Sequence, residues 1–257
     1  MTEDPAIPAF KDHFSAQAAG YSRYRPHYPD ELFRFLASVC AERARAWDCG
    51  CGNGQAAVGL AAHFAQVRAT DPSERQIANA TGPANVAYSV ARAEASGLAS
   101  GCVNLVLAAQ AAHWFTFDAF FAEVRRVARP AGVVALVGYA LMTIGPEIDD
   151  IVRAFYGETL GAYWPPERAH TETEYGTLPF PFAEIAFPPI AMGASWSLGH
   201  LLGFLDTWSA LARYRAATGR DPLPAVAEAL AAHWGDPDDE KEVVWTLFAR
   251  VGRVFGD

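Results

Sequence analysis

A glycine-rich turn constrains this chain more than any other feature of its sequence. Three glycines alternate with other residues in the stretch WDCGCGNGQ, residues 47–55. Residues 45–48 before it have the pattern of a short strand, and residues 56–64 after it carry apolar side chains at helical spacing. Because glycine has no Cβ and tolerates positive φ, such a turn lets the backbone approach a ligand closely. The start of the following helix adds unpaired N–H donors.

The alternation of strand and helix continues beyond this turn. Strands are expected at residues 66–70, 86–90, 103–109 and 133–141, and helices at 30–40, from about 73, and at 117–128. The helix near residue 73 begins with a capping box, Ser73 to Gln76, and residues 130–132 are expected to form a turn. Crossover connections of this kind predict a parallel sheet with helices on both faces. A ligand is then expected beyond the carboxyl ends of the strands.

The second part of the chain has a different pattern. We expect a helix at 148–160, a segment rich in proline and aromatic residues at 163–189, a long amphipathic helix at about 198–217 and a late strand at 242–251. The sequence has no internal repeat and no low-complexity linker. One domain with an inserted cap therefore fits best, divided as residues 1–142, 143–183 and 184–257.

Charge and composition exclude several classes of partner. The formal net charge of −9 argues against nucleic acid, because binding to phosphates needs a basic face. The longest apolar run, residues 131–144, is shorter than a membrane span, and the acidic N-terminal segment does not have the pattern of a signal peptide. Four cysteines in 257 residues are not a disulfide framework. We therefore expect a cytoplasmic protein, either a monomer or a homodimer, that acts on a small molecule.

The two cysteines in the glycine-rich turn raise the question of a thiol site. A zinc site needs about four ligands, but only one Cys-x-Cys pair is present, and redox motifs have two residues between their cysteines. We therefore expect no metal. A dinucleotide fingerprint, G-x-G-x-x-G, would need its last glycine at position 55, where the sequence has Gln55. The pattern here is G-x-G-x-G.

Polar residues follow three of the predicted strands. Asp71 ends the second strand, where a carboxylate can accept hydrogen bonds from both hydroxyls of a ribose, or can cap the next helix. Glu94 follows the third strand and could face an adenine or lie in solvent. His113 and Trp114 follow the fourth strand, where chemistry is expected, although a structural histidine fits this position equally well.

Together these residues resemble the class I S-adenosylmethionine (SAM)-dependent methyltransferases, and within them the trans-aconitate methyltransferase-like family. The resemblance covers about residues 10–255. It rests on the following segments: YSRYRPHYP (21–29), DCGCGNGQ (48–55), DPS (71–73), AHWF (112–115), EVRRV (123–127) with PAG (130–132), YWP (163–165) and GFLDTWS (203–209). It implies a Rossmann-like α/β fold, with a seven-stranded sheet whose last strand is antiparallel, helices on both faces, and a helical and aromatic cap.

The resemblance also implies a set of residues around SAM. Those expected near its methionine part and sulfonium are Tyr21, Arg25, Asp48, Gly50, Cys51, Gly52 and Gln110. Those expected near its ribose and adenine are Asp71, Pro72, Ser73, Ile77, Ala93 and Glu94. The sequence has Glu94 where the family frequently has Asp, and either side chain supplies an acceptor.

The methyl donor in such enzymes is already activated, so the protein must mainly align the acceptor and exclude water. A carboxylate acceptor needs no base, whereas a hydroxyl, amine or carbon acid needs one. His113 is the candidate base, with Trp114 beside it, and Tyr139, Trp164 and Trp208 are candidate substrate contacts.

The expected function is therefore SAM-dependent methyl transfer to a small molecule, with O-methylation of a carboxylic acid as one form. Two alternatives stay open at this point. The first is a SAM-binding protein without catalytic activity. The second is a nicotinamide-dependent oxidoreductase, against which the glycine spacing argues.

Overall fold

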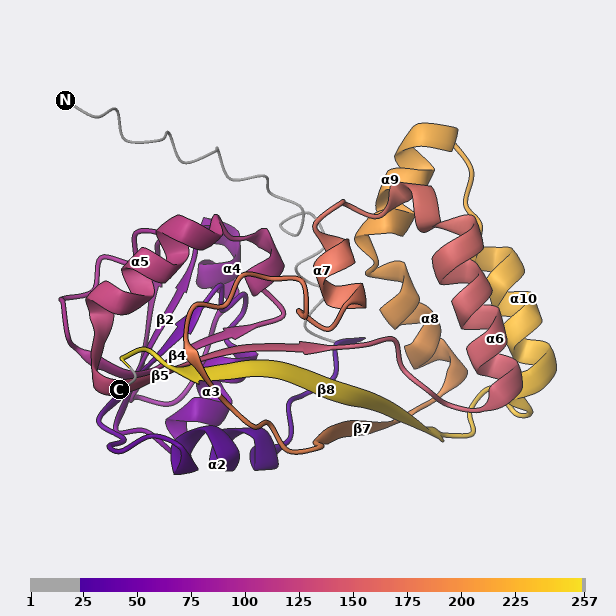
Figure 1. Ribbon diagram of the computed structural model, residues 1–257. Helices are drawn as coiled ribbons and strands as arrows, with labels where there is room; N and C mark the ends of the chain where they lie inside the picture. The colour runs from indigo at the N-terminus through magenta and orange to yellow at the C-terminus, as the bar shows by residue number, and fades with distance from the viewer. Residues whose placement is uncertain (1–23, 256–257) are drawn as a thin grey trace.

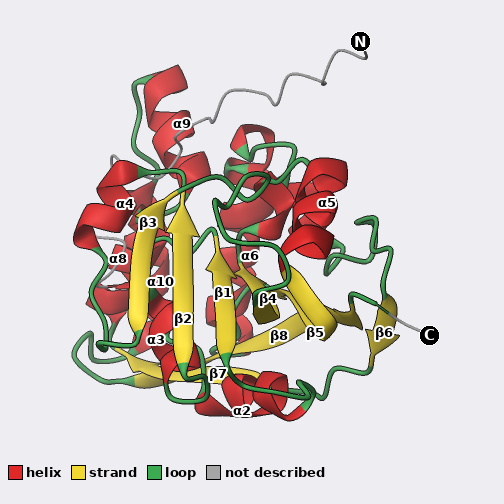
Figure 2. Ribbon diagram, turned by 90° about the vertical axis from the view of Figure 1, so that its left-hand side faces the viewer, coloured by secondary structure: helices red, strands yellow, loops and turns green. Residues whose placement is uncertain are grey.

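A mixed β-sheet forms the centre of the computed structural model, which describes residues 24–255 (Figure 1). Five strands are parallel: β1 (Arg45–Cys49), β2 (Gln66–Asp71), β3 (Val86–Val90), β4 (Val103–Ala109) and β5 (Ala128–Tyr139). Three more, β6 (Ala183–Ile185), β7 (Ala191–Trp196) and β8 (Lys241–Arg253), join as antiparallel pairs. The order is β3-β2-β1-β4-β5-β8-β6, with β7 paired to β8 beside this path (Figure 2).

The two central strands explain why the sheet is covered on both faces. Nearly every residue of β1 and β4 is buried, as continuous apolar strands of a parallel sheet require. Leu105 and Leu107 pack on one face, whereas Val106 and Ala108 pack on the other. The chain runs outward from β1 through β2 to β3 and then returns to β4 on the other side of β1. This reversal opens a crevice at the carboxyl ends of β1 and β4.

Four helices of the first half cover this sheet: α2 (Asp30–Ser38), α3 (Gln55–Ala61), α4 (Glu74–Asn79) and α5 (Phe117–Val127). Apolar residues of α2 and α3 belong to the larger buried cluster, and those of α5 belong to the cluster on the opposite face. The predicted Rossmann-like α/β fold is confirmed, including the antiparallel strand β8 beside β5.

The helices after β5 form a second group beside the sheet (Figure 1). They are α6 (Pro146–Ala154), α7 (Arg168–Glu172), α8 (Leu198–Asp206), α9 (Ser209–Thr218) and α10 (Leu223–Trp234). Helix α10 contacts both α6 and α8, so the group unites helices from both sides of residue 183. The division into 143–183 and 184–257 stays a prediction.

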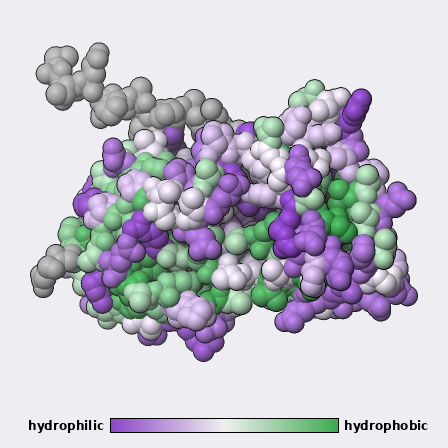
Figure 3. Space-filling view, turned by 45° about the vertical axis from the view of Figure 1, so that its right-hand side comes forward, coloured by the Kyte–Doolittle hydropathy of each residue, from purple (hydrophilic) through white to green (hydrophobic). Residues whose placement is uncertain are grey.

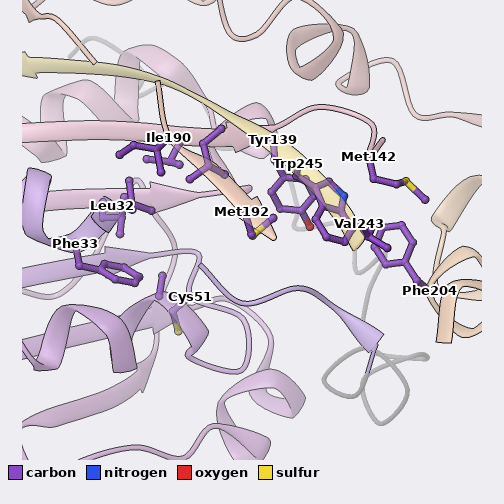
Figure 4. Packing of buried hydrophobic residues seen from close by; sticks show 14 of the residues in the cluster. Leu32, Phe33, Cys51, Tyr139, Met142, Ile190, Met192, Phe204, Val243 and Trp245 are labelled. Atoms are coloured by element: carbon purple, nitrogen blue, oxygen red, sulfur yellow. The ribbon is translucent and has the colours of Figure 1, made fainter. Parts of the chain in front are cut away.

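One apolar cluster connects this helical group to the sheet. Figure 4 shows side chains of α2, β7, β8 and α8 within it, among them Met192, Phe204 and Trp245. Because the same cluster packs against both the sheet and the helices, the two parts share a core.

The prediction of one long helix at 198–217 is wrong. The chain forms α8 and α9 instead, with a break at Thr207 and Trp208. The Thr207 hydroxyl donates to the carbonyl oxygen of Phe204 at 2.6 Å, and Trp208 is extended with ψ 127°. Trp208 is buried among the rings of Phe155 and Phe204, so tertiary packing overrides the helical pattern.

Other boundaries also differ from the sequence prediction. The helix expected at 148–160 begins at Pro146 and changes to a π-helical turn at Phe155–Thr159. The turn expected at 130–132 is a bulge inside β5, where Ala131 has φ 58° and the pairing with β4 shifts. Strands β6 and β7 and helices α7 and α10 were not predicted.

The surface mixes polar and apolar residues, as Figure 3 shows for one face. Within residues 24–255, the exposed large hydrophobic residues are Val58 in α3, Val90 in β3 and Phe255 after β8. No helix in this part of the chain is long and apolar enough to cross a membrane.

Candidate functional site

A cavity of about 530 Å³ lies at the carboxyl ends of β1, β2 and β4. Its wall comes from the loops that follow these strands and from residues near the start of the described chain, such as Arg25 and Tyr28. This is the crevice that the reversal of strand order predicts, and the volume is in the range of small-molecule sites.

The glycine-rich turn forms one side of the cavity. Gly50, Gly52 and Gly54 all have positive φ, at 69°, 53° and 93°. A Cβ at Gly50 would lie 2.7 Å from Ala111 Cβ, and one at Gly54 would lie 2.4 Å from the hydroxyl of Tyr88. A Cβ at Gly52 would meet no described atom within 4 Å. Gly52 is therefore the glycine whose open side faces the ligand space.

Asp71 holds this turn against the loop after β2. Its two carboxylate oxygens accept hydrogen bonds from the backbone N–H groups of Gly52 and Ser73, both at 2.9 Å. Helix α4 is capped by the Ser73 hydroxyl, which accepts from the N–H of Gln76 at 3.3 Å. Ser73 therefore caps α4, and Asp71 connects the glycine-rich turn to the loop after β2. Because each carboxylate oxygen can accept more than one hydrogen bond, Asp71 can also bind a ligand hydroxyl.

Asp48 is a buried carboxylate that lines the cavity. Among the described residues, neither of its oxygens has a partner in hydrogen-bonding geometry, and the same is true of Gln55 Nε2. Burial raises the pKa of Asp48 to about 7, an effect that the Ala57 N–H partly offsets. A buried acid of this kind fits a ligand that brings a positive charge.

The thiols beside the glycines are not poised for chemistry. Cys49 and Cys51 are buried, and burial raises the pKa of both thiols well above the usual range. Since the thiolate is the reactive and metal-binding form, neither side chain is activated. Within residues 24–255, no cluster of three or more metal-ligating side chains occurs.

Glu94 connects two loops of the cavity wall. Its side chain is 5% exposed, and one oxygen accepts from the Thr116 N–H at 2.8 Å. The other oxygen accepts from Arg92 Nε at 3.4 Å. Glu94 is therefore not a solvated loop residue. It fixes the entry to α5 and places Ala93 in the wall.

Gln110, directly after β4, has a backbone conformation that is uncommon for a non-glycine residue. Its φ is 53°, and its amide Nε2 donates to the carbonyl oxygen of Tyr139 at 3.1 Å. Strained residues of this kind occur often at ligand sites. Gln110 and Tyr139 both line the cavity, at neighbouring strand ends.

His113 lies in a short 3₁₀ turn after β4 and is 6% exposed. Its Nδ1 is 3.0 Å from the hydroxyl of Tyr175 and 3.5 Å from that of Thr171. Burial, together with the charges of Arg168 and His170, lowers the pKa of His113 to about 3. The imidazole is therefore neutral at physiological pH.

Arg25 brings a positive charge to the cavity wall. Its Nη1 donates to the hydroxyl of Tyr139 at 3.2 Å, and its guanidinium lies 5.1 Å from the centre of the Phe204 ring. The contact with Phe204 holds Arg25 against the helical group while the residue lines the cavity.

The structure brings most of the sequence-predicted site residues into this one cavity. Its wall includes Arg25, Asp48, Gly50, Cys51, Gly52, Asp71, Pro72, Ser73, Ala93, Glu94, Gln110, His113, Trp114 and Tyr139. Tyr21 lies outside the described residues. Ile77 does not line the cavity, and Trp164 and Trp208 pack against each other in an aromatic cluster outside the cavity wall.

Sequence reasoning missed several wall residues. Gln55 was detectable, because it begins the helix after the glycine-rich turn. Others lie in loops or in the helices α4, α5 and α7, and their place in the wall depends on tertiary packing: Tyr28, Gln76, Arg92, Phe115, Phe117, Glu167 and His170.

Comparison with known proteins gives concordant results. The family model of a methyltransferase domain matches residues 47–136. A Dictyostelium discoideum protein named as a methyltransferase is 36% identical over 244 residues, which cover 93% of each chain. A solved structure from Anaeromyxobacter dehalogenans, described as a type II methyltransferase, has 47% identity and a TM-score of 0.86, and covers 91% of this chain and 100% of that one.

A more distant structure shows the shared fold alone. This structure, from Anabaena variabilis, is described as a methyltransferase from an antibiotic biosynthesis pathway. It has 16% identity, a TM-score of 0.54, and coverage of 88% of this chain and 98% of that one.

Proposed function

This chain belongs to the class I SAM-dependent methyltransferases, and we propose that it methylates a small carboxylic acid on oxygen. SAM is its cofactor and supplies a methyl group on a positively charged sulfur. The narrower trans-aconitate-like membership stays a prediction, as do the cytoplasmic location and the monomeric or homodimeric state.

The cavity residues fit SAM. The unpartnered carboxylate of Asp48 suits the ammonium group of the methionine part, and the open side of Gly52 gives that part room. Asp71, already held by two backbone N–H groups, suits the ribose hydroxyls. The assignments of Ser73, Ala93 and Glu94 to the adenosine end are consistent with their place in the wall.

The main support for a carboxylic acid as the methyl acceptor is the low basicity of His113. With its pKa lowered to about 3, this imidazole is a weak base at neutral pH. An acceptor that must lose a proton would gain little help from it. A carboxylate is ionised already, so its oxygen can attack the methyl carbon directly. The new O–CH₃ bond forms as the S–CH₃ bond breaks, and the products are a methyl ester and S-adenosylhomocysteine.

Arg25 supports the same acceptor class. Its guanidinium is held beside Tyr139 in the cavity wall, and it favours an anion there. Alignment of the acceptor with the methyl group supplies most of the acceleration.

The test is a radiolabelled-methyl assay with matched acceptors. Each small acid is paired with the alcohol and the amine of the same carbon skeleton. We expect label transfer to acids, in a product that mild base hydrolyses to labelled methanol. Base-stable label on phenols or amines, with none on acids, would overturn the acceptor class. SAM binding without transfer across a broad panel would instead favour the catalytically inactive alternative.

A further inference from the structure

We propose that Tyr175 is a positioning residue that holds His113 in the neutral tautomer with its proton on Nε2, so that His113 donates a hydrogen bond to the acceptor. The tautomer is a property of the protein alone. The role toward a carboxylate rests on the proposed function.

Tyr175 is buried completely and packs edge-on against the ring of Phe248 in β8 at 5.1 Å. Its hydroxyl lies 3.0 Å from His113 Nδ1. Within residues 24–255, His113 Nδ1 is the only hydrogen-bond partner of the Tyr175 hydroxyl. The contact joins residues 62 positions apart, so the tertiary structure alone creates it.

The count of donors and acceptors decides which nitrogen carries the proton. A neutral imidazole has one N–H and one bare nitrogen. If Nδ1 carried the proton, the buried hydroxyl hydrogen of Tyr175 would have no acceptor among the described residues, and an unsatisfied buried donor is costly. Tyr175 therefore donates to a bare Nδ1, and the proton is on Nε2.

The second nitrogen faces the cavity. His113 is a wall residue, and Nε2 has no hydrogen-bond partner within the described part of the chain. Nε2 is also not completely enclosed by the protein. The Nε2–H is thus left for a ligand in the cavity, whose wall also includes Trp114 and Arg25. A carboxylate acceptor would receive this N–H on the oxygen that does not react.

The backbone around Tyr175 supports a role beyond packing. Glu174 and Tyr175 both have left-handed φ values, 51° and 61°, which are costly for non-glycine residues. The Tyr175 N–H closes the end of α7 by donating to the carbonyl oxygen of His170 at 2.8 Å. This turn points the Tyr175 side chain back beneath the cavity wall, where it meets His113.

The direct test is nitrogen NMR of the protein labelled with ¹⁵N at histidine, in the absence of any acceptor. Long-range ¹H–¹⁵N correlations distinguish the two tautomers, and the signals of His113 are identified by their loss in His113→Asn. We expect a bare Nδ1 and a protonated Nε2 in the wild type, and a mixture of tautomers in Tyr175→Phe. Tyr214→Phe removes a hydroxyl from a residue that does not line the cavity, and it should change nothing. A protonated Nδ1 in the wild type, or an unchanged tautomer in Tyr175→Phe, would overturn the proposal.

Kinetics test the role toward the acceptor. With an accepted acid, Tyr175→Phe should raise the KM for the acid about tenfold, with kcat changed less than threefold and SAM affinity within twofold, because a lost hydrogen bond to a charged group weakens binding of the ground state. An unchanged KM for the acid would refute the acceptor role. If no acid is methylated at all, the proposed acceptor class fails, whereas the NMR result still decides the tautomer.

Discussion

Asp48 is the residue whose ionisation most directly connects stability to ligand binding. Its carboxyl is buried, and among the described residues it lacks a partner in hydrogen-bonding geometry. In the unfolded chain this group has a pKa near 3.8, whereas the folded protein holds its proton up to about pH 7. Folding therefore takes up a proton between these values, and the stability of the SAM-free protein falls as pH rises through this window.

Asp48→Asn should remove this dependence. We expect the variant to be more stable than the wild type at pH 8, by an amount that exceeds its gain at pH 5 by on the order of 2–3 kcal/mol. Urea unfolding of the SAM-free protein at the two pH values measures this. Asp118→Asn, at an exposed position of α5, controls for the loss of one charge. Equal gains at both pH values would contradict the assigned state of Asp48.

Gly52 and Cys49 provide a second residue-scale prediction. Gly52→Val should abolish SAM binding in a folded protein, because no described atom occupies the space beside its Cα and the new side chain would extend into the cavity. Its positive φ adds a stability cost of about 1–2 kcal/mol. Cys49→Ala should leave SAM affinity within about twofold, because a buried, protonated thiol is a small apolar side chain here. Calorimetric titration compares the two. Loss of SAM binding in Cys49→Ala alone would refute this reading.

Elements depend on packing between helices as much as on local pattern. The break between α8 and α9 places Trp208 against the rings of Phe155, Tyr156, Trp164 and Phe204. These aromatic side chains fix the angle between α8 and α9 and hold the π-helical turn after α6 against them. The tryptophans of this cluster therefore support the cap and do not form the cavity wall.

Trp208→Ala should destabilise the protein by about 3–5 kcal/mol, because it leaves a cavity among the aromatic rings. Trp208→Phe keeps a ring in place and should cost less. Both variants should retain wild-type KM values for SAM and acceptor while folded. Chemical unfolding and steady-state kinetics check these outcomes. A raised acceptor KM with unchanged stability would restore the sequence-based assignment of Trp208 as a substrate contact.

The whole molecule places the binding cavity where the sheet, the glycine-rich turn and the helical group meet. Arg25 contacts Phe204 of α8 and Tyr139 of β5, so a ligand in the cavity touches parts that share one core. Binding should therefore stabilise the entire fold, by the mass-action relation between ligand concentration and affinity.

SAM at 100 times its Kd should add about 2.7 kcal/mol, which corresponds to a rise in Tm of roughly 5–10 °C for a chain of this size. S-adenosylhomocysteine should act similarly, whereas NAD should give no shift. Differential scanning fluorimetry with all three measures this, and Asp71→Ala should suppress the SAM shift. A shift with NAD but none with SAM would contradict the cofactor assignment for this chain.

Local pattern was enough to predict the sheet core and the edge of the sheet where the cavity lies, whereas most of the individual cavity residues were implied by the family resemblance. Strands β1 to β5 have apolar runs that are interpretable on their own, and the glycine spacing after β1 marks the loop where a ligand binds. Most of the predicted site residues follow strands β1 to β4. Because these strands are parallel, their carboxyl ends meet at one edge of the sheet. Asp71 was predicted for this reason, whereas Gly52 and Gln110 were implied by the resemblance to the SAM-dependent methyltransferases.

The tertiary structure alone decided the rest, because it joins residues that no local pattern relates. Trp208 interrupts an apolar helical pattern since it packs among rings from three other segments. Tyr175 reaches His113 from 62 positions away and determines which nitrogen is bare. The sequence by itself determined a SAM-type cradle, through glycines that need positive φ and acids at strand ends. Burial and long-range contacts determined the charge of Asp48 and the neutral state of His113, because both depend on what surrounds a side chain in three dimensions.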